Sequence, residues 1–204
     1  FFPNVVKLNL LITLYLWVYL INIVNFTDGC DGFLAVNSIT FFSGSLLFCF
    51  INNTYNVIFL TSLSFLPILL AYLYYNKPKA KIFMGDAGSI TIGFCMGLVS
   101  FNLINLGYWD VVISLLSYTL IDCSLTIFNK MRNGNLPWAR LFDYYFLKPI
   151  MKDKNNHKKV FLLNILCNFI ILTIAVFQII LDLKILFLAS ILSSIIFINI
   201  YKKI

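Results

Sequence analysis

Residues 160–181 read VFLLNILCNFIILTIAVFQIIL, a run without a single charged side chain. A helix that crosses the roughly 30 Å hydrocarbon core of a membrane needs about 20 mostly apolar residues. Other stretches of the chain meet the same requirement; they cover residues 8–24, 34–51, 55–75, 89–106, 111–128 and 185–201. The sequence therefore predicts about seven transmembrane helices.

The composition of the whole chain supports a membrane protein. Of its 204 residues, 61% are hydrophobic and 11% are charged, whereas an ordinary soluble domain has about 25% charged residues. Spanning segments must satisfy their own backbone polar groups, so they form helices or a closed barrel. Continuous apolar runs without period-two alternation favour helices. We predict an all-α polytopic integral membrane protein, with residues 1–204 forming a single transmembrane domain.

The basic residues predict the orientation of the helices. If the loop at 25–33 is cytoplasmic, alternation places the loops 76–88 and 129–159 and the tail 202–204 on the same side. These segments contain 13 of the 15 Lys and Arg residues, and cytoplasmic loops normally carry such an excess. We therefore expect an inner (plasma) membrane protein whose polar loops face the cytoplasm. Topology accounts for the net charge of +7, so no nucleic-acid partner is needed.

The first cytoplasmic loop, NFTDGCDGF at residues 25–33, contains two aspartates that are each followed by glycine. Residues three apart are neighbours on a helical turn, so Asp28 and Asp31 are expected to face the same way. A shared cation or a basic ligand group would relieve the repulsion between them. The alternative is a solvated Asp-Gly turn at a helix end.

The second loop and the residues after it read NKPKAKIFMGDAGS at 76–89. Asp86 precedes the predicted start of the next helix, whose amino end has free N–H groups and a positive dipole that attract phosphate. A carboxylate at that point can hold Mg²⁺, which prefers oxygen ligands and often bridges phosphates. Alternatively, Asp86 serves only as a favourable charge at a helix start.

The third loop, residues 129–159, contains both arginines and the only histidine, His157. The guanidinium of Arg140 offers the bidentate geometry that phosphate suits. The loop is also basic enough to be attracted to anionic lipid headgroups. Residues 140–150 could lie along the membrane surface as a short amphipathic or re-entrant piece. These accounts are compatible with one another.

Asp122 lies inside the predicted span 111–128. A carboxylate within a membrane span indicates either a functional site or a polar contact between packed helices. A transporter is therefore a rival class, in which Asp28, Asp31 and Asp122 would line a path through the membrane. Transporters often show repeated halves and broken helices at mid-membrane, whereas most of these carboxylates gather on one side.

Two loop motifs resemble those of a known family. The pattern N-x-x-N-x-x-D-G-x-D-G is matched by Asn22, Asn25, Asp28, Gly29, Asp31 and Gly32. The pattern F-M-G-D-x-G-S is matched by Phe83, Met84, Gly85, Asp86, Gly88 and Ser89, with Asn76 upstream. Over roughly residues 8–165 the chain resembles the polyprenyl-phosphate N-acetylhexosamine-1-phosphate transferases, polytopic enzymes with MraY-like and WecA-like members.

The resemblance implies a function and a set of site residues. It implies Mg²⁺-dependent transfer of a sugar-1-phosphate from a UDP-N-acetylhexosamine to a membrane polyprenyl phosphate, with release of UMP. A homodimer is an open option. The implied catalytic residues are Asp28, Asp31, Asp86 and His157. The implied substrate-binding residues are Asn25, Asn76, Phe83, Gly85 and Arg140. Asp86 is the implied ligand of Mg²⁺, or of Mn²⁺ in its place.

The chain departs from the family pattern in three respects. Ala139 and Arg140 lack the histidine that separates the corresponding residues in WecA-like members, and His157 comes much later. The triple histidine of MraY-like members is absent from the sequence, which counts against a muropeptide substrate. The family's upstream pair of aspartates is also missing, so we expect a C-terminal portion of a larger family domain that is inactive alone. An inactive membrane remnant is the remaining alternative.

Overall fold

The computed structural model describes residues 4–136 and 144–204 and contains seven helices long and apolar enough to cross a membrane. They are α1 (Asn4–Phe26), α2 (Phe33–Ile51), α3 (Val57–Asn76), α4 (Gly85–Asn105), α5 (Trp109–Arg132), α7 (His157–Leu181) and α8 (Phe187–Lys203). A short helix, α6 (Lys148–Lys152), lies between α5 and α7. No strand occurs within the two described ranges. The predicted all-α polytopic fold is confirmed.

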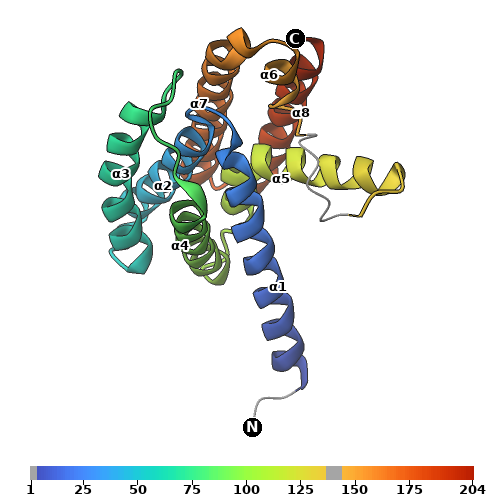
Figure 1. Ribbon diagram of the computed structural model, residues 1–204. Helices are drawn as coiled ribbons and strands as arrows, with labels where there is room; N and C mark the ends of the chain where they lie inside the picture. Colours follow the sequence, from blue (N-terminus) through green and yellow to red (C-terminus); the bar gives the residue numbers. More distant parts are fainter. Residues whose placement is uncertain (1–3, 137–143) are drawn as a thin grey trace.

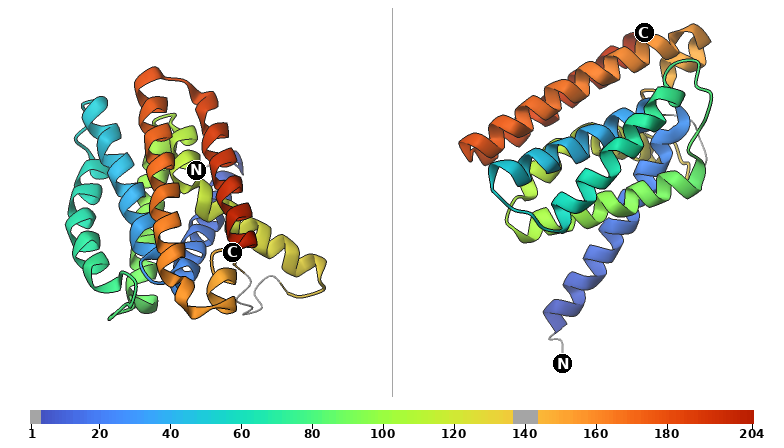
Figure 2. Two further views of the ribbon diagram at one scale, coloured as in Figure 1. Left: turned by 90° about the horizontal axis from the view of Figure 1, so that it is seen from above. Right: turned by 90° about the vertical axis from the view of Figure 1, so that its left-hand side faces the viewer.

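Helix α2 lies between α3 and α7 in the bundle (Figures 1 and 2). Helix α2 contacts α3 on one side and α7 on the other, while α5 contacts α7 and α8. Helix α1 packs along α4 and then continues beyond the other helices toward the N-terminus. The C-terminal half of α5 also extends past the bundle to one side (Figure 1).

Two glycines of α4 set the close approach of α1. A Cβ atom on Gly93 would lie 2.9 Å from the Cα atom of Ile21, and one on Gly97 would lie 2.2 Å from Nε1 of Trp17. That nitrogen instead donates a hydrogen bond to the carbonyl oxygen of Phe94, at 3.1 Å. Small residues that let backbones approach are a common basis of helix packing in membranes. The end of α1 is thereby held beside the start of α4.

Buried asparagines hold α7 against α2. The Asn168 amide nitrogen donates to Oδ1 of Asn37 at 2.7 Å, and the Asn164 amide nitrogen donates to the carbonyl oxygen of Phe33 at 3.3 Å. All three asparagines are buried, and polar groups inside a membrane bundle are stabilised by such partners. The start of α7 is consequently held close to the start of α2.

Candidate functional site

The α1–α2 turn separates the two aspartates of the first loop. Asp28 belongs to a single 3₁₀ turn, Thr27–Gly29, whereas Cys30 is extended with φ −142° and ψ 142°. Gly32 then adopts a φ of +69°, and a Cβ atom there would lie 2.4 Å from the ring of Phe161. The helical turn that would make Asp28 and Asp31 face the same way is therefore broken. Each carboxylate binds a different part of the second loop, and the expectation that the two share a cation or a basic group stays a prediction.

Asp28 fixes the start of α4. Its Oδ2 atom accepts a hydrogen bond from the backbone N–H of Gly85 at 2.9 Å, and its Oδ1 atom accepts one from the hydroxyl of Tyr72 at 3.3 Å. Gly85 has a φ of +63°, in the left-handed region that glycine adopts readily. The next residue, Asp86, is exposed in the first turn of α4. The first and second loops thus meet at the amino end of this helix.

Asp31 joins all three loops. The carboxylate is buried, and its Oδ2 atom accepts hydrogen bonds from the backbone N–H groups of Lys79 at 3.2 Å and Ala80 at 3.3 Å. Nδ1 of His157, the first residue of α7, lies 3.4 Å from the same oxygen. A carboxylate has about four lone-pair sites, so one group can accept from several donors. The single histidine of the sequence, His157, therefore lies beside the turn that contains Asp28 and Asp31.

The cysteine between the two aspartates does not add a nucleophile. Burial, with the nearby charge of Asp31, raises the pKa of the Cys30 thiol far above its ordinary value. The thiolate is the nucleophilic form of cysteine, and this environment suppresses it. The chemistry of the turn therefore rests on its carboxylates.

Two of the three motif asparagines, Asn25 and Asn76, connect the loops. Asn76 is fully buried; its Oδ1 atom accepts from the N–H of Gly32 at 2.8 Å, and its amide donates to the carbonyl of Ile82 at 2.7 Å. In this structure Asn76 holds the loops together, and it has no exposed surface with which to contact a substrate directly. The Ser89 hydroxyl lies 2.6 Å from Oδ1 of Asn25. This contact links α1 to α4 beside Asp86.

A cavity of about 470 Å³ opens next to Asp31 and His157. Its other lining residues are Lys77, Pro78, Lys79, Lys154, Asn155, Lys158, Phe161 and Leu162. Four lysines face a single aspartate, so the cavity attracts anions. Phe83, on the second loop, is 57% exposed and leaves an aromatic face available. Arg140 lies outside the described residues.

The third loop is fixed by Asp122, a residue whose role the sequence left open. Its Oδ1 atom accepts from the backbone N–H of Tyr145 at 3.0 Å, and its Oδ2 atom accepts from that of Phe146 at 3.4 Å. The hydroxyls of Tyr118 and Thr126 also donate to this buried carboxylate, at 2.9 and 3.3 Å. Asp122 thus anchors the third loop, and these four contacts, which come from its own helix and from that loop, account for its position in the span.

The segment after residue 143 packs into the bundle. Tyr144, Tyr145, Phe146 and Leu147 are all buried. The ring of Phe146 stacks on that of Phe33 at the start of α2, with ring centroids 4.1 Å apart. For this part of residues 140–150, aromatic packing and the contacts to Asp122 draw the chain into the bundle, and whether the piece is re-entrant stays a prediction. No pattern of period or charge in the sequence predicts this contact.

The described residues fit only one kind of metal site. Within 4–136 and 144–204, no group of three or more His, Cys, Asp or Glu side chains could enclose a metal ion. Asp28 and Asp31 already accept backbone N–H groups, whereas Asp86 is exposed. Mg²⁺ is commonly held by one or two carboxylates together with water and substrate phosphates. The donor set thus fits Mg²⁺ brought together with a phosphate, and it does not fit a cage built by protein alone.

The fold and the loops define a class of protein. The chain is a multi-pass membrane protein in which three polar loops meet at one end of the bundle, around carboxylates, lysines and a helix amino end. The sequence pattern of glycosyl transferase family 4 matches residues 1–104, about half of the chain. The chain belongs to this family. The matched region covers the helices α1 to α4 almost completely, with the first two loops.

Several curated proteins are similar to the chain. A phospho-N-acetylmuramoyl-pentapeptide-transferase of Leuconostoc citreum is 37% identical over 99 residues, which is 47% of this chain and 30% of the relative. Proteins of the same name from Wolbachia pipientis and Prochlorococcus marinus are 42% identical over 79 residues and 44% identical over 85 residues. These two matches cover 39% and 41% of this chain and 24% of each relative. The chain spans about a quarter to a third of the length of the curated relatives it matches.

Proposed function

We propose that the complete protein transfers an N-acetylhexosamine-1-phosphate from a UDP-sugar to a membrane polyprenyl phosphate and releases UMP. We place this reaction at the cytoplasmic face of the inner (plasma) membrane, in the synthesis of a cell-wall or surface polysaccharide. The observation that carries the proposal is the hydrogen bond from the N–H of Gly85 to Asp28, because it sets Asp86 beside the first loop. Family membership supports the same reaction class.

The charges of the site suit a reaction between two anions. Both the lipid phosphate and the nucleotide diphosphate are negative, so the protein must neutralise charge and align the reacting groups. The lysines around the 470 Å³ cavity and the amino end of α4 each supply positive potential on the side of the bundle that carries the polar loops. The lipid substrate arrives from the membrane and the nucleotide from the cytoplasm, which accounts for polar loops at the end of a bundle of apolar helices.

The individual residues take distinct roles in this proposal. Asp86 would hold Mg²⁺ (or Mn²⁺), and the bound ion would neutralise charge on the phosphates. Asp28 orients the amino end of α4 through Gly85, and Asp31 orients the lysine-bearing loop through Lys79. His157 lies beside Asp31 at the cavity, and in this proposal it would donate a hydrogen bond to a phosphate oxygen. The exposed ring of Phe83 offers a surface on which a nucleotide base can stack.

The sugar is proposed only as a class. The relatives are named for an N-acetylmuramoyl-pentapeptide, whereas the third loop of this chain lacks the triple histidine that the MraY-like pattern includes. We therefore propose an N-acetylhexosamine without a peptide as the first substrate to assay. UDP-GlcNAc, UDP-GalNAc and UDP-MurNAc-pentapeptide together distinguish the options.

The test is UMP release by the complete protein in membranes that contain polyprenyl phosphate. Asp86→Asn should lower Mg²⁺-dependent UMP release on the order of 100-fold or more, because a loss of charge stabilisation in the transition state has an effect of this size. Asp182→Asn is the matched control, since Asp182 is an exposed aspartate at the opposite end of the bundle. Wild-type turnover by the Asp86 variant would overturn the metal role. Failure of the wild type with all three nucleotides would support a membrane remnant.

A further inference from the structure

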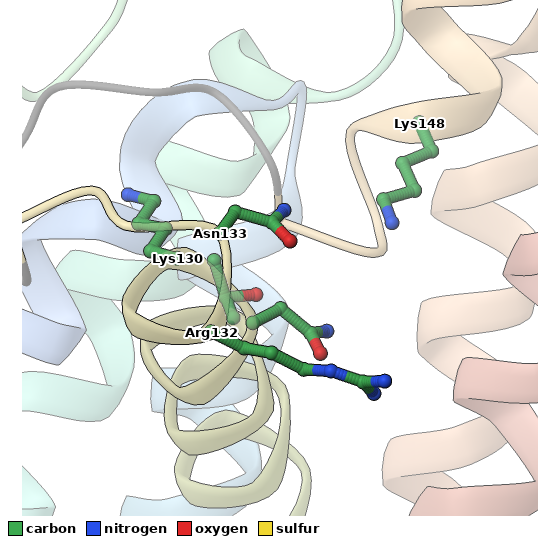
Figure 3. Close-up of a pocket in the computed structure, with 6 residues that line it drawn as sticks. Lys130, Arg132, Asn133 and Lys148 are labelled. Atoms are coloured by element: carbon green, nitrogen blue, oxygen red, sulfur yellow. The ribbon is translucent and has the colours of Figure 1, made fainter.

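A second cavity, of about 400 Å³, lies at the C-terminal end of α5. It shares no lining residue with the cavity at Asp31. Its lining residues are Thr126, Asn129, Lys130, Arg132, Asn133 and Lys148, all of them polar or charged (Figure 3). No carboxylate is among these residues, so the cavity has a strong positive charge.

Two cations from different helices line this cavity on the same side. Lys148 extends from α6 toward α5, and the guanidinium of Arg132 extends from the end of α5 to the same side (Figure 3). The ammonium group of Lys130 points to the other side of α5, where it lies 5.4 Å from the centre of the Tyr144 ring. Guanidinium and ammonium groups at one place, with amide donors from Asn129 and Asn133, are a set that binds phosphate.

The position of Lys148 is fixed by packing. Its Nζ atom lies 4.1 Å from the centre of the Tyr145 ring, and Nζ of Lys202, in α8, lies 4.7 Å from the same ring. The amide of Asn129 donates a hydrogen bond to the hydroxyl of Tyr145. The backbone N–H of Tyr145 is in turn bound by Asp122. One wall of the cavity is therefore attached to the core of the bundle.

The surroundings of the cavity indicate what kind of phosphate it receives. The last turn of α5 also carries two strongly exposed apolar side chains, Phe128 at 64% and Met131 at 57%. Arg132 ends the membrane-spanning length of this helix, which extends past the bundle (Figure 1). Lysine and arginine side chains beside exposed apolar side chains at the end of a span are suited to bind a lipid. The lipid headgroup would lie in the cavity, and its acyl chains would contact the apolar side chains.

We propose that this cavity binds the phosphodiester headgroup of an anionic phospholipid, with Arg132 and Lys148 on the phosphate. Asn129 and Asn133 provide donors to the remaining oxygens, and Phe128 contacts the acyl chains. The site is separate from the proposed catalytic residues. A bound lipid would connect α5 to α6 and thereby stabilise the anchored third loop.

Purified protein in detergent, with phosphatidylglycerol added, tests the proposal by native mass spectrometry. The double variant Arg132→Gln, Lys148→Gln should retain phosphatidylglycerol at least 10-fold less than the wild type. The control is Lys152→Gln with Lys203→Gln, which removes two charges from exposed residues of α6 and α8 that do not line the cavity. Equal loss of lipid in test and control variants would overturn the site.

Two further measurements keep the result interpretable. If the double variant does not fold, Arg132→Gln alone is used, because this exposed side chain contributes little to packing. For the wild type, phosphatidylglycerol should raise the melting temperature more than phosphatidylcholine or millimolar inorganic phosphate. An equal rise with phosphatidylcholine would overturn headgroup recognition, and an equal rise with inorganic phosphate would overturn the lipid as its source.

Discussion

Replacing Asp122 with alanine should destabilise the protein, because this buried carboxylate is the acceptor for four donors. The hydroxyls of Tyr118 and Thr126 can rotate toward other acceptors. The backbone N–H groups of Tyr145 and Phe146 cannot, and a buried donor left without a partner costs about 1–3 kcal/mol. The contact of Phe146 is long, at 3.4 Å, and contributes least. We therefore expect a loss of about 2–4 kcal/mol in the free energy of unfolding.

The assay is reversible unfolding of the purified protein in mixed detergent, followed by circular dichroism. Asp122→Asn keeps one carbonyl oxygen in place and should lose roughly half as much, about 1–2 kcal/mol. Tyr118→Phe removes a single donor and should cost about 1 kcal/mol or less. If the alanine variant unfolded at the same denaturant concentration as the wild type, the third loop would not depend on this carboxylate. The anchoring argument would then be refuted.

Two more substitutions test the contacts between the first and second loops. Asn76→Ala removes the acceptor of the Gly32 N–H and the donor to the Ile82 carbonyl, so thermal unfolding should show a loss of about 2–4 kcal/mol. An unchanged melting temperature would contradict this. Gly85→Ala forces a side chain to a φ of +63° in open space, so it should cost about 1–2 kcal/mol through backbone strain alone. A melting curve equal to the wild type's would show that the start of α4 adopts another conformation.

The sequence predicted the membrane fold well, because hydrocarbon length and backbone hydrogen bonding leave few alternatives. Each predicted span corresponds to an observed helix, and the change that bears on the proposed site is at α4, which begins at Gly85 rather than near Ser89. This change places Asp86 inside the first helical turn. The positive φ of Gly85 allows the earlier start, and neither hydropathy nor charge pattern reveals it.

The contacts within the site could not be predicted in the same way. Spacing suggested that Asp28 and Asp31 share a face, but the extended conformation of Cys30 sends them to different segments. Asp122 was recognised as a charge inside a span, yet the backbone N–H groups from which it accepts lie 23 and 24 residues further along the chain. Long-range contacts of this kind depend on how α2, α5 and the third loop pack, which no local pattern encodes.

The carboxylates of the two motifs therefore belong to two physical classes. Asp28 and Asp31 are occupied by backbone N–H groups, so their negative charge is used to fix the shape of two loops. Asp86 is exposed at a helix amino end and keeps its charge available for a ligand. A carboxylate has about four lone-pair sites, so these backbone contacts leave capacity for a further ligand, but they already fix the positions of Asp28 and Asp31. The division follows from exposure and from existing contacts, and it makes Asp86 the residue at which binding chemistry and loop folding can be separated by experiment.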